Sequence, residues 1–115
     1  MNPTELANAI AKYLDDKKAR DIVLISLAGK TVIADYFAVC SAGSATAVKA
    51  LCEHLDERLS RDHNIEPLRR DIDPKWAAVD YGSVIVHIQT ADAHAFYDLE
   101  RLWSDGTNVT RFSAK

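Results

Sequence analysis

Apolar side chains recur along this chain at two spacings, one typical of amphipathic helices and one typical of buried strands. Three segments repeat apolar residues every three to four positions, which predicts helices with one buried face over residues 3–14, 45–61 and 91–104. Two short runs, 21–27 and 36–40, are almost continuously apolar and rich in β-branched residues. Such runs predict central strands that are covered on both faces.

The predicted helices carry start and stop signals. Asn2 can cap the first helix, with Pro3 at its first position and Glu5 completing a capping box. Ser44 is the predicted N-cap of the second helix, and Gly106 is the predicted stop of the third. The side chains that share the apolar face of the third helix are predicted to be core: Phe96, Leu99 and Trp103.

The second half of the chain predicts a hairpin and an edge strand. Residues 76–81 and 83–89 are predicted to form the two strands of a hairpin around Tyr81-Gly82. This turn is short, and its glycine accepts a positive φ. Residues 65–72 suit an edge strand interrupted by proline. Residues 31–34 fit either irregular structure or a short helical turn.

The order of these elements predicts an α+β fold in layers, with a mixed β-sheet of about four or five strands covered by helices. At 115 residues the chain is long enough for one hydrophobic core and too short for two. We therefore expect a single domain over residues 1–106. Residues 107–115 are expected to form a C-terminal tail.

The charge of the chain indicates which class of partner it is expected to bind. The formal net charge is −3, and the lysines and arginines are scattered. Little or no direct nucleic-acid binding is expected, because affinity for phosphates comes mainly from a basic face. A basic protein is the better partner for an acidic surface. The sequence has neither a secretory signal nor an apolar run long enough for a membrane span, so we expect a cytoplasmic protein with no membrane contact.

The usual signatures of catalysis and cofactor binding are missing from the sequence. The four histidines and two cysteines are not at metal-ligand spacing, so no metal site is predicted. Cys40 and Cys52 lie among apolar neighbours and are expected to be buried, reduced thiols. No phosphate-binding glycine loop is present, and no cofactor is expected. The chain is accordingly expected not to be an enzyme.

One pattern supports an alternative of another class. Gly43-Ser44 after a strand, followed by a helix and then Asp71 and Asp73, resembles the layout of metal-dependent nucleotidyltransferases. Two aspartates separated by one residue on a strand share a face and could hold Mg²⁺. The long gap between Ser44 and Asp71, and a proline directly after Asp73, argue against this alternative.

Several segments together resemble the ribosomal silencing factor, or iojap-like, family. D-Y-G-x-V-x-V-H-I over residues 80–88, followed by F-Y-x-L-E-x-L-W over 96–103, carries most of the resemblance. Residues 14–23, 33–37 and 48–51 extend it, so that it spans roughly residues 5–105. The chain departs from the family pattern in the stretch before Trp76, in the Ser41–Ser44 turn, and at Ala47, where an arginine is common.

The resemblance implies a fold related to nucleotidyltransferases but without their catalytic site. It also implies binding to a ribosomal protein on the intersubunit face of the large ribosomal subunit. Occupying that face would block joining of the small subunit and repress translation, and a role in large-subunit biogenesis is also implied. A homodimeric adaptor with another partner is the third reading of the sequence, and homodimerisation itself stays open.

The partner-binding residues follow from the same motifs. Trp76, Asp80 and Tyr81 match the family pattern, and an aromatic anchor beside a carboxylate suits an interface with a basic protein. Asp35 and Tyr36 are further candidates, although they could equally serve the entry into a strand. Trp76 could be a core residue at the sheet edge. His87 could be buried or could face a partner.

Overall fold

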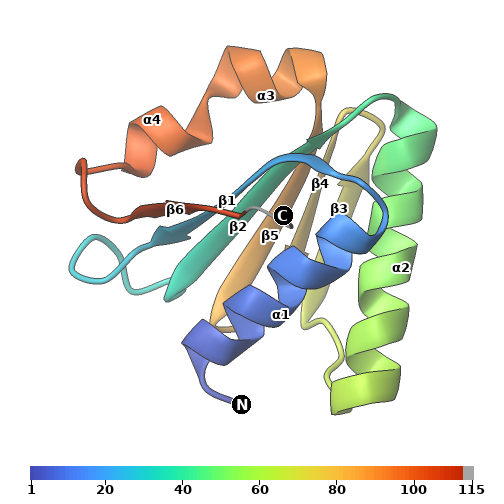
Figure 1. Ribbon diagram of the computed structural model, residues 1–115, viewed down its shortest axis with the longest axis horizontal. Coiled ribbons are helices and arrows are strands. Elements are labelled where there is room, and N and C mark those ends of the chain that lie inside the picture. The colour runs from blue at the N-terminus through green and yellow to red at the C-terminus, as the bar shows by residue number, and fades with distance from the viewer. Residues whose placement is uncertain (113–115) are drawn as a thin grey trace.

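The computed structural model describes residues 1–112; the last three residues of the predicted tail lie outside the described part. Four helices and six strands occur in this part of the chain (Figure 1). In chain order they are α1 (Pro3–Asp16), β1 (Arg20–Ser26), β2 (Tyr36–Ala42), α2 (Ala45–His63), β3 (Arg69–Asp73), β4 (Trp76–Asp80), β5 (Val84–Thr90), α3 (Ala91–Tyr97), α4 (Leu99–Trp103) and β6 (Val109–Arg111).

The strands form one mixed sheet in the order β3-β4-β5-β2-β1-β6. Strands β2 and β5 are parallel, and every other neighbouring pair is antiparallel. The predicted fold class is confirmed. The predicted edge strand is present as β3, but it covers residues 69–73 rather than 65–72, and Pro67 lies before it. The prediction of about four or five strands is wrong, because the sheet has six strands with β6 included.

Helices cover both faces of the sheet (Figure 1). Helices α1 and α2 lie on one face, and α3 and α4 lie on the other. Strands β1 and β2 are buried on both faces, as their continuous apolar runs predict. Strand β4 alternates instead: Ala77 and Val79 are buried in the core under α1 and α2, whereas Trp76, Ala78 and Asp80 are half-buried on the opposite face.

The predicted starts of the first two helices are confirmed. Asn2 accepts a hydrogen bond from the Glu5 backbone N–H at 2.8 Å, and the Glu5 carboxylate accepts one from the Asn2 N–H at 3.0 Å. The Ser44 hydroxyl accepts a bond from the Ala47 N–H at 3.1 Å. These bonds satisfy backbone donors that would otherwise have no partner in the first turn.

The third predicted helix is divided into two, which corrects the prediction of one helix over 91–104. Asp98 has left-handed backbone angles (φ 45°, ψ 59°) and ends α3 where α4 begins. A residue in this conformation changes the direction of the helix axis, so the two parts do not share one face. Leu99 is buried and Trp103 packs edge-on against Phe37, but Phe96 is 81% exposed. The prediction that Phe96 belongs to the core is wrong.

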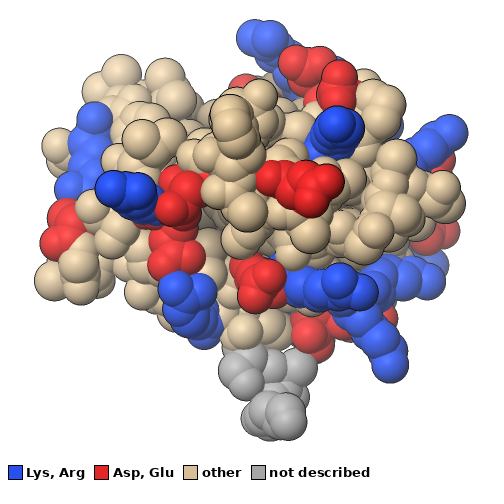
Figure 2. Space-filling view, turned by 90° about the horizontal axis from the view of Figure 1, so that it is seen from above, with Lys and Arg blue, Asp and Glu red and all other residues tan. Residues whose placement is uncertain are grey.

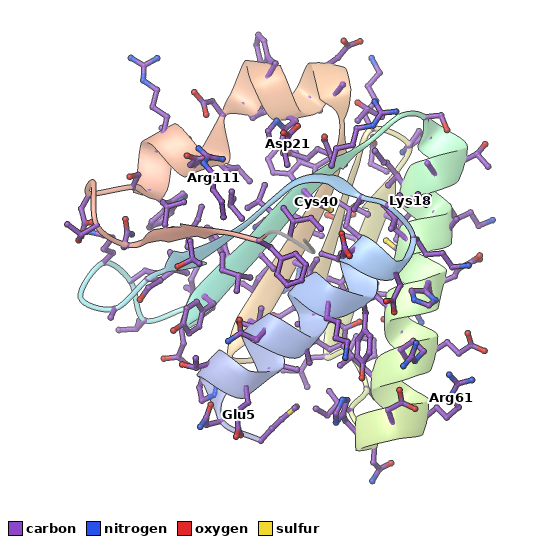
Figure 3. The ribbon with its side chains drawn as sticks, in the orientation of Figure 1. Glu5, Lys18, Asp21, Cys40, Arg61 and Arg111 are labelled. Carbon is purple, nitrogen blue, oxygen red and sulfur yellow. The ribbon has the colours of Figure 1, made fainter. Side chains whose placement is uncertain are left out.

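Part of the predicted tail belongs to the sheet. Val109 pairs with Ile25 as β6 aligns antiparallel along the free edge of β1. The Asn108 side chain directs this return by donating hydrogen bonds to the Ser26 carbonyl (2.8 Å) and the Trp103 carbonyl (2.9 Å). Arg111 on β6 forms an ion pair with Glu100 on α4 (Figure 3).

Both cysteines are free and buried, as the sequence predicts. Cys40 lies on β2 beneath α1 (Figure 3). Burial raises the pKa of the Cys52 thiol to about 11, so that thiol stays protonated near neutral pH. None of the helices within residues 1–112 has the length and apolar character needed to cross a membrane.

Candidate protein-docking surfaces

Strand β4 separates the predicted partner-binding residues into two groups. Trp76 begins the strand and Asp80 ends it, so that their side chains leave the same face at opposite ends. At roughly 3.3 Å per residue, the two positions lie about 13 Å apart. Trp76 and Asp80 therefore belong to two different surfaces.

Asp80 shapes the turn that follows it. Its carboxylate accepts a hydrogen bond from the Gly82 N–H at 2.7 Å, and Gly82 has a φ of +93°. The Tyr81 N–H donates to the Val84 carbonyl at 2.9 Å and closes the turn between β4 and β5. The left-handed backbone explains why a glycine stands at position 82.

Tyr81 points into the fold from the same turn. Its side chain is only 7% exposed, and its hydroxyl donates a hydrogen bond to Asp56 on α2. Arg70 of β3 forms an ion pair with the same Asp56 carboxylate at 3.0 Å. Burial is the main cause that raises the pKa of Tyr81, followed by its hydrogen bond to Asp56. Tyr81 thus ties the turn to α2, and its ring is not on the surface.

Asp35 and Tyr36 lie beside this turn. The backbone N–H groups of both residues donate to the Ser83 carbonyl, at 2.8 Å and 3.1 Å. The Asp35 side chain is exposed, whereas the Tyr36 hydroxyl shares a hydrogen bond with the Thr4 hydroxyl at 3.0 Å. Three segments distant in sequence therefore meet at this end of the sheet.

Exposed apolar residues lie near Asp35 and near the turn that follows Asp80. Val32 and Ile33 line a shallow pocket together with Asp35 and Ser83, and Leu68 lies beside Gly82. The three apolar side chains are between 60% and 101% exposed. We name this area the turn surface: Val32, Ile33, Asp35, Leu68 and Asp80. Within residues 1–112, neither of its carboxylates forms an ion pair.

Trp76 lies at the other end of β4, beside a groove between β3 and α3. The groove has a volume of about 790 Å³. We name it the aromatic groove after the side chains that line it: Trp76, Phe96 and Tyr97, with the carboxylates of Asp71, Asp73 and Asp92. Trp76 is half-buried and packs at the edge of the core that covers β1 and β2 on this face. Its contact with a partner stays a prediction.

His87 holds the Trp76 ring in place. The Trp76 indole N–H donates to the His87 Nδ1 at 3.0 Å, which leaves the imidazole proton on Nε2. His87 also packs edge-on against Phe37, with ring centroids 4.7 Å apart. Burial lowers the pKa of His87 from 6.5 to about 4, so the ring is neutral at pH 7. His87 thus fixes the orientation of the Trp76 ring through a hydrogen bond from its buried side.

Charges on the face that carries α3 and α4 are mixed. Figure 2 shows acidic and basic side chains interspersed there, with uncharged surface between them. Basic side chains also gather into one group at the lower right of this view (Figure 2).

The residues of the nucleotidyltransferase alternative are not brought together. The Ser44 hydroxyl is occupied as the cap of α2. Asp71 and Asp73 share a face of β3, but β3 lies three strands from β2, or about 14 Å at the usual strand spacing. Residues 1–112 contain no group of three or more His, Cys, Asp or Glu side chains placed to hold a metal ion. The geometry assigns Ser44 to the helix cap.

Replacing Ser44 by alanine is expected to lower the free energy of unfolding by about 1 kcal/mol, because the Ala47 N–H loses its acceptor. Ser44→Asp is the matched control, since aspartate retains a capping oxygen and also suits the helix dipole. Urea unfolding of the three proteins measures the difference. Equal stability of the alanine variant and the parent would contradict the assignment.

Sequence reasoning left out Asp56 and Asp92 and left His87 undecided. All three contribute to these surfaces or to the residues that support them. Asp56 falls between Cys52 and Leu59 in the apolar stripe of α2, and a carboxylate at such a position is a detectable sign of a buried hydrogen bond. Asp92 and the Trp76–His87 bond have no comparable sign. Both depend on how α3 and β5 are placed against β4.

The turn surface combines exposed apolar side chains with two carboxylates that form no ion pair within residues 1–112. Comparison with known proteins shows the family to which the chain belongs. The sequence matches the family model described as "Ribosomal silencing factor during starvation" over residues 1–115. The chain belongs to the ribosomal silencing factor (RsfS) family. The resemblance drawn from the sequence motifs is thereby confirmed.

Relatives of this RsfS-family chain share most of its length. The protein named ribosomal silencing factor RsfS from Halalkalibacterium halodurans is 33% identical over 111 residues, covering 95% of this chain and 94% of that protein. A mouse protein named "Mitochondrial assembly of ribosomal large subunit protein 1" is 27% identical, covering 83% of this chain and 43% of the mouse protein. A crystal structure of a Chromobacterium violaceum protein superposes with a TM-score of 0.85 at 24% identity, covering 100% of this chain and 98% of that one. This likeness shows a shared fold.

Proposed function

We propose that this chain binds the large ribosomal subunit and sterically prevents the small subunit from joining, which represses translation. The observation that carries the proposal is the match of the whole chain to the silencing-factor family. The names of the relatives point to the ribosome and, for the mouse protein, to the large ribosomal subunit. The proposed place of action is the cytoplasm.

The turn surface is the proposed contact with a basic ribosomal protein. Asp80 and Asp35 would meet arginine or lysine side chains of the partner, and the exposed apolar residues beside them would be covered. Tyr36 borders this surface, and Tyr81 would act indirectly by holding the turn against α2. Trp76 would contribute a second contact from the aromatic groove.

The proposed mechanism is competition without a chemical step. A protein that binds only the free large subunit weakens subunit joining by the factor 1 + [L]/Kd, where [L] is its free concentration. The affinity for the large subunit then sets the degree of repression. We propose that the chain acts without catalysis and without a cofactor.

Sedimentation of mixed subunits tests the proposal. Purified large and small ribosomal subunits are combined at fixed magnesium with increasing amounts of the protein and separated on a sucrose gradient. We expect the joined peak to decrease while the protein migrates with the large subunit. If the protein stays at the top of the gradient and the joined peak is unchanged, the proposed function is wrong.

A role in large-subunit biogenesis is the second candidate, and the name of the mouse relative is the observation that favours it. It predicts that depletion of the protein leads to accumulation of precursor large subunits.

Self-association through exposed apolar side chains such as Leu102 is an accompanying proposal. Sedimentation equilibrium of the isolated chain would test it.

A further inference from the structure

The aromatic groove presents ring surface that is exposed within residues 1–112. Phe96 is 81% exposed and Tyr97 is 48% exposed, although both are large and apolar or amphipathic. The rings of Trp76 and Tyr97 lie 4.7 Å apart between centroids, and those of Phe96 and Tyr97 lie 5.0 Å apart. These contacts join the three rings into one wall of the groove.

The Trp76 ring is fixed before any partner arrives. Its indole N–H is already used by His87, so what Trp76 can offer to the groove is its π surface rather than a hydrogen-bond donor. A ring held by a buried neighbour loses little side-chain entropy on binding. The groove is therefore preorganised for a flat or cationic group.

Carboxylates surround the aromatic wall. Asp71 and Asp73 project from the same face of β3, and Asp92 lines the groove from the first turn of α3. None of the three forms an ion pair with a described residue. One oxygen of Asp73 accepts the Lys75 backbone N–H at 3.0 Å, and Lys75 is the only basic side chain in the lining. The groove keeps an excess of negative charge.

Aromatic surface beside carboxylates fits a guanidinium group better than other cations. A guanidinium stacks on aromatic faces and is weakly hydrated, and its fork of donors matches a carboxylate. An ammonium group lacks the flat face and holds its water more strongly. Phosphates would be repelled by the three carboxylates.

We propose that the aromatic groove binds an arginine side chain of a basic protein segment. The guanidinium stacks on the wall formed by Trp76 and Tyr97 and donates hydrogen bonds to Asp71 or Asp73. The inference deepens the proposed function, on which it rests for the basic nature of the partner. It adds a second anchoring point about 13 Å along β4 from Asp80.

The test uses the full chain and a short acetylated, amidated glycine–arginine peptide. Trp103→Phe removes the other tryptophan, so that fluorescence reports on Trp76. We expect the peptide to change Trp76 fluorescence in a saturable way. A peptide with citrulline in place of arginine keeps the shape without the charge, and it should bind at least about tenfold more weakly.

Paired variants separate the groove from general attraction between opposite charges. Asp71→Asn with Asp73→Asn is expected to weaken peptide binding about tenfold or more. Glu53→Gln with Glu57→Gln removes the same charge from exposed positions on α2 and should leave binding within about twofold. Asp92→Asn provides an independent groove variant, and thermal melting checks that each variant is folded.

Several results would overturn the proposal: no saturable change at millimolar peptide, equal binding of the citrulline peptide, or equal weakening by the two variant pairs. The experiment contains no ribosomes, so its failure is distinct from failure of the proposed function. Subunit joining with the same groove variants then measures how much the groove contributes on the ribosome.

Discussion

Asp80→Lys is expected to abolish migration with the large subunit and to restore subunit joining, with a loss of affinity of about a hundredfold or more. The substitution places a positive charge against the proposed basic partner, and like charges at an interface cost several kcal/mol. At about 1.4 kcal/mol per tenfold change, a cost near 3 kcal/mol gives this factor. The measurement is the sucrose gradient with purified subunits.

Asp80→Asn is the matched control, because asparagine keeps an acceptor for the Gly82 N–H and removes only the charge. We expect an intermediate loss of about tenfold, as suits a charge-assisted hydrogen bond. Lys17→Glu, at an exposed position after α1, should have little effect. Full activity of a folded Asp80→Lys protein would remove Asp80 from the contact and with it the turn surface.

Acid is expected to destabilise the fold through His87. The pKa of this residue is about 4 in the folded chain, compared with 6.5 for an exposed imidazole. The unfolded chain therefore binds a proton at a higher pH than the folded chain does. As the pH falls from about 6.5 to about 4, the free energy of unfolding decreases, and below pH 4 this contribution is constant. The difference in pKa corresponds to about 3 kcal/mol.

The comparison with His87→Gln isolates this effect. Glutamine does not titrate and can offer an oxygen to the Trp76 indole N–H, so the variant should lose less stability between pH 7 and pH 4 than the parent. His94→Gln on α3 is the control for removing a histidine elsewhere. Urea unfolding at a series of pH values gives the curves. Parallel curves for the parent and His87→Gln would contradict a depressed His87 pKa.

The local elements were predictable because their signals lie within a few residues of one another. The Asn2–Glu5 capping box and the Ser44 cap each join residues three positions apart. The apolar runs of β1 and β2 can be recognised without knowing which strands lie beside them. The hairpin around Gly82 is equally local. Family membership was also readable from the sequence, because it rests on motifs rather than on contacts.

The division of the last predicted helix and the pairing of β6 could not be predicted in the same way. Residues 91–103 keep a helical spacing across Asp98, and only packing of Leu99 and Trp103 on the sheet reveals the change of direction. Val109–Arg111 contains one apolar residue, so its strand character depends on the free edge that β1 offers. The break at Asp98 and the formation of β6 both depend on long-range contacts, which override the local propensity of the sequence.

The sequence by itself determined the fold class, the N-caps of the first two helices, the central strands and the family of this protein. The tertiary structure alone decided that Tyr81 faces Asp56 in the interior and that Phe96 is exposed. The physical reason is that the spacing of apolar residues along the sequence shows which side chains share one face of a helix or strand. Which partner meets that face, and whether any does, is fixed by how elements far apart in the chain pack together.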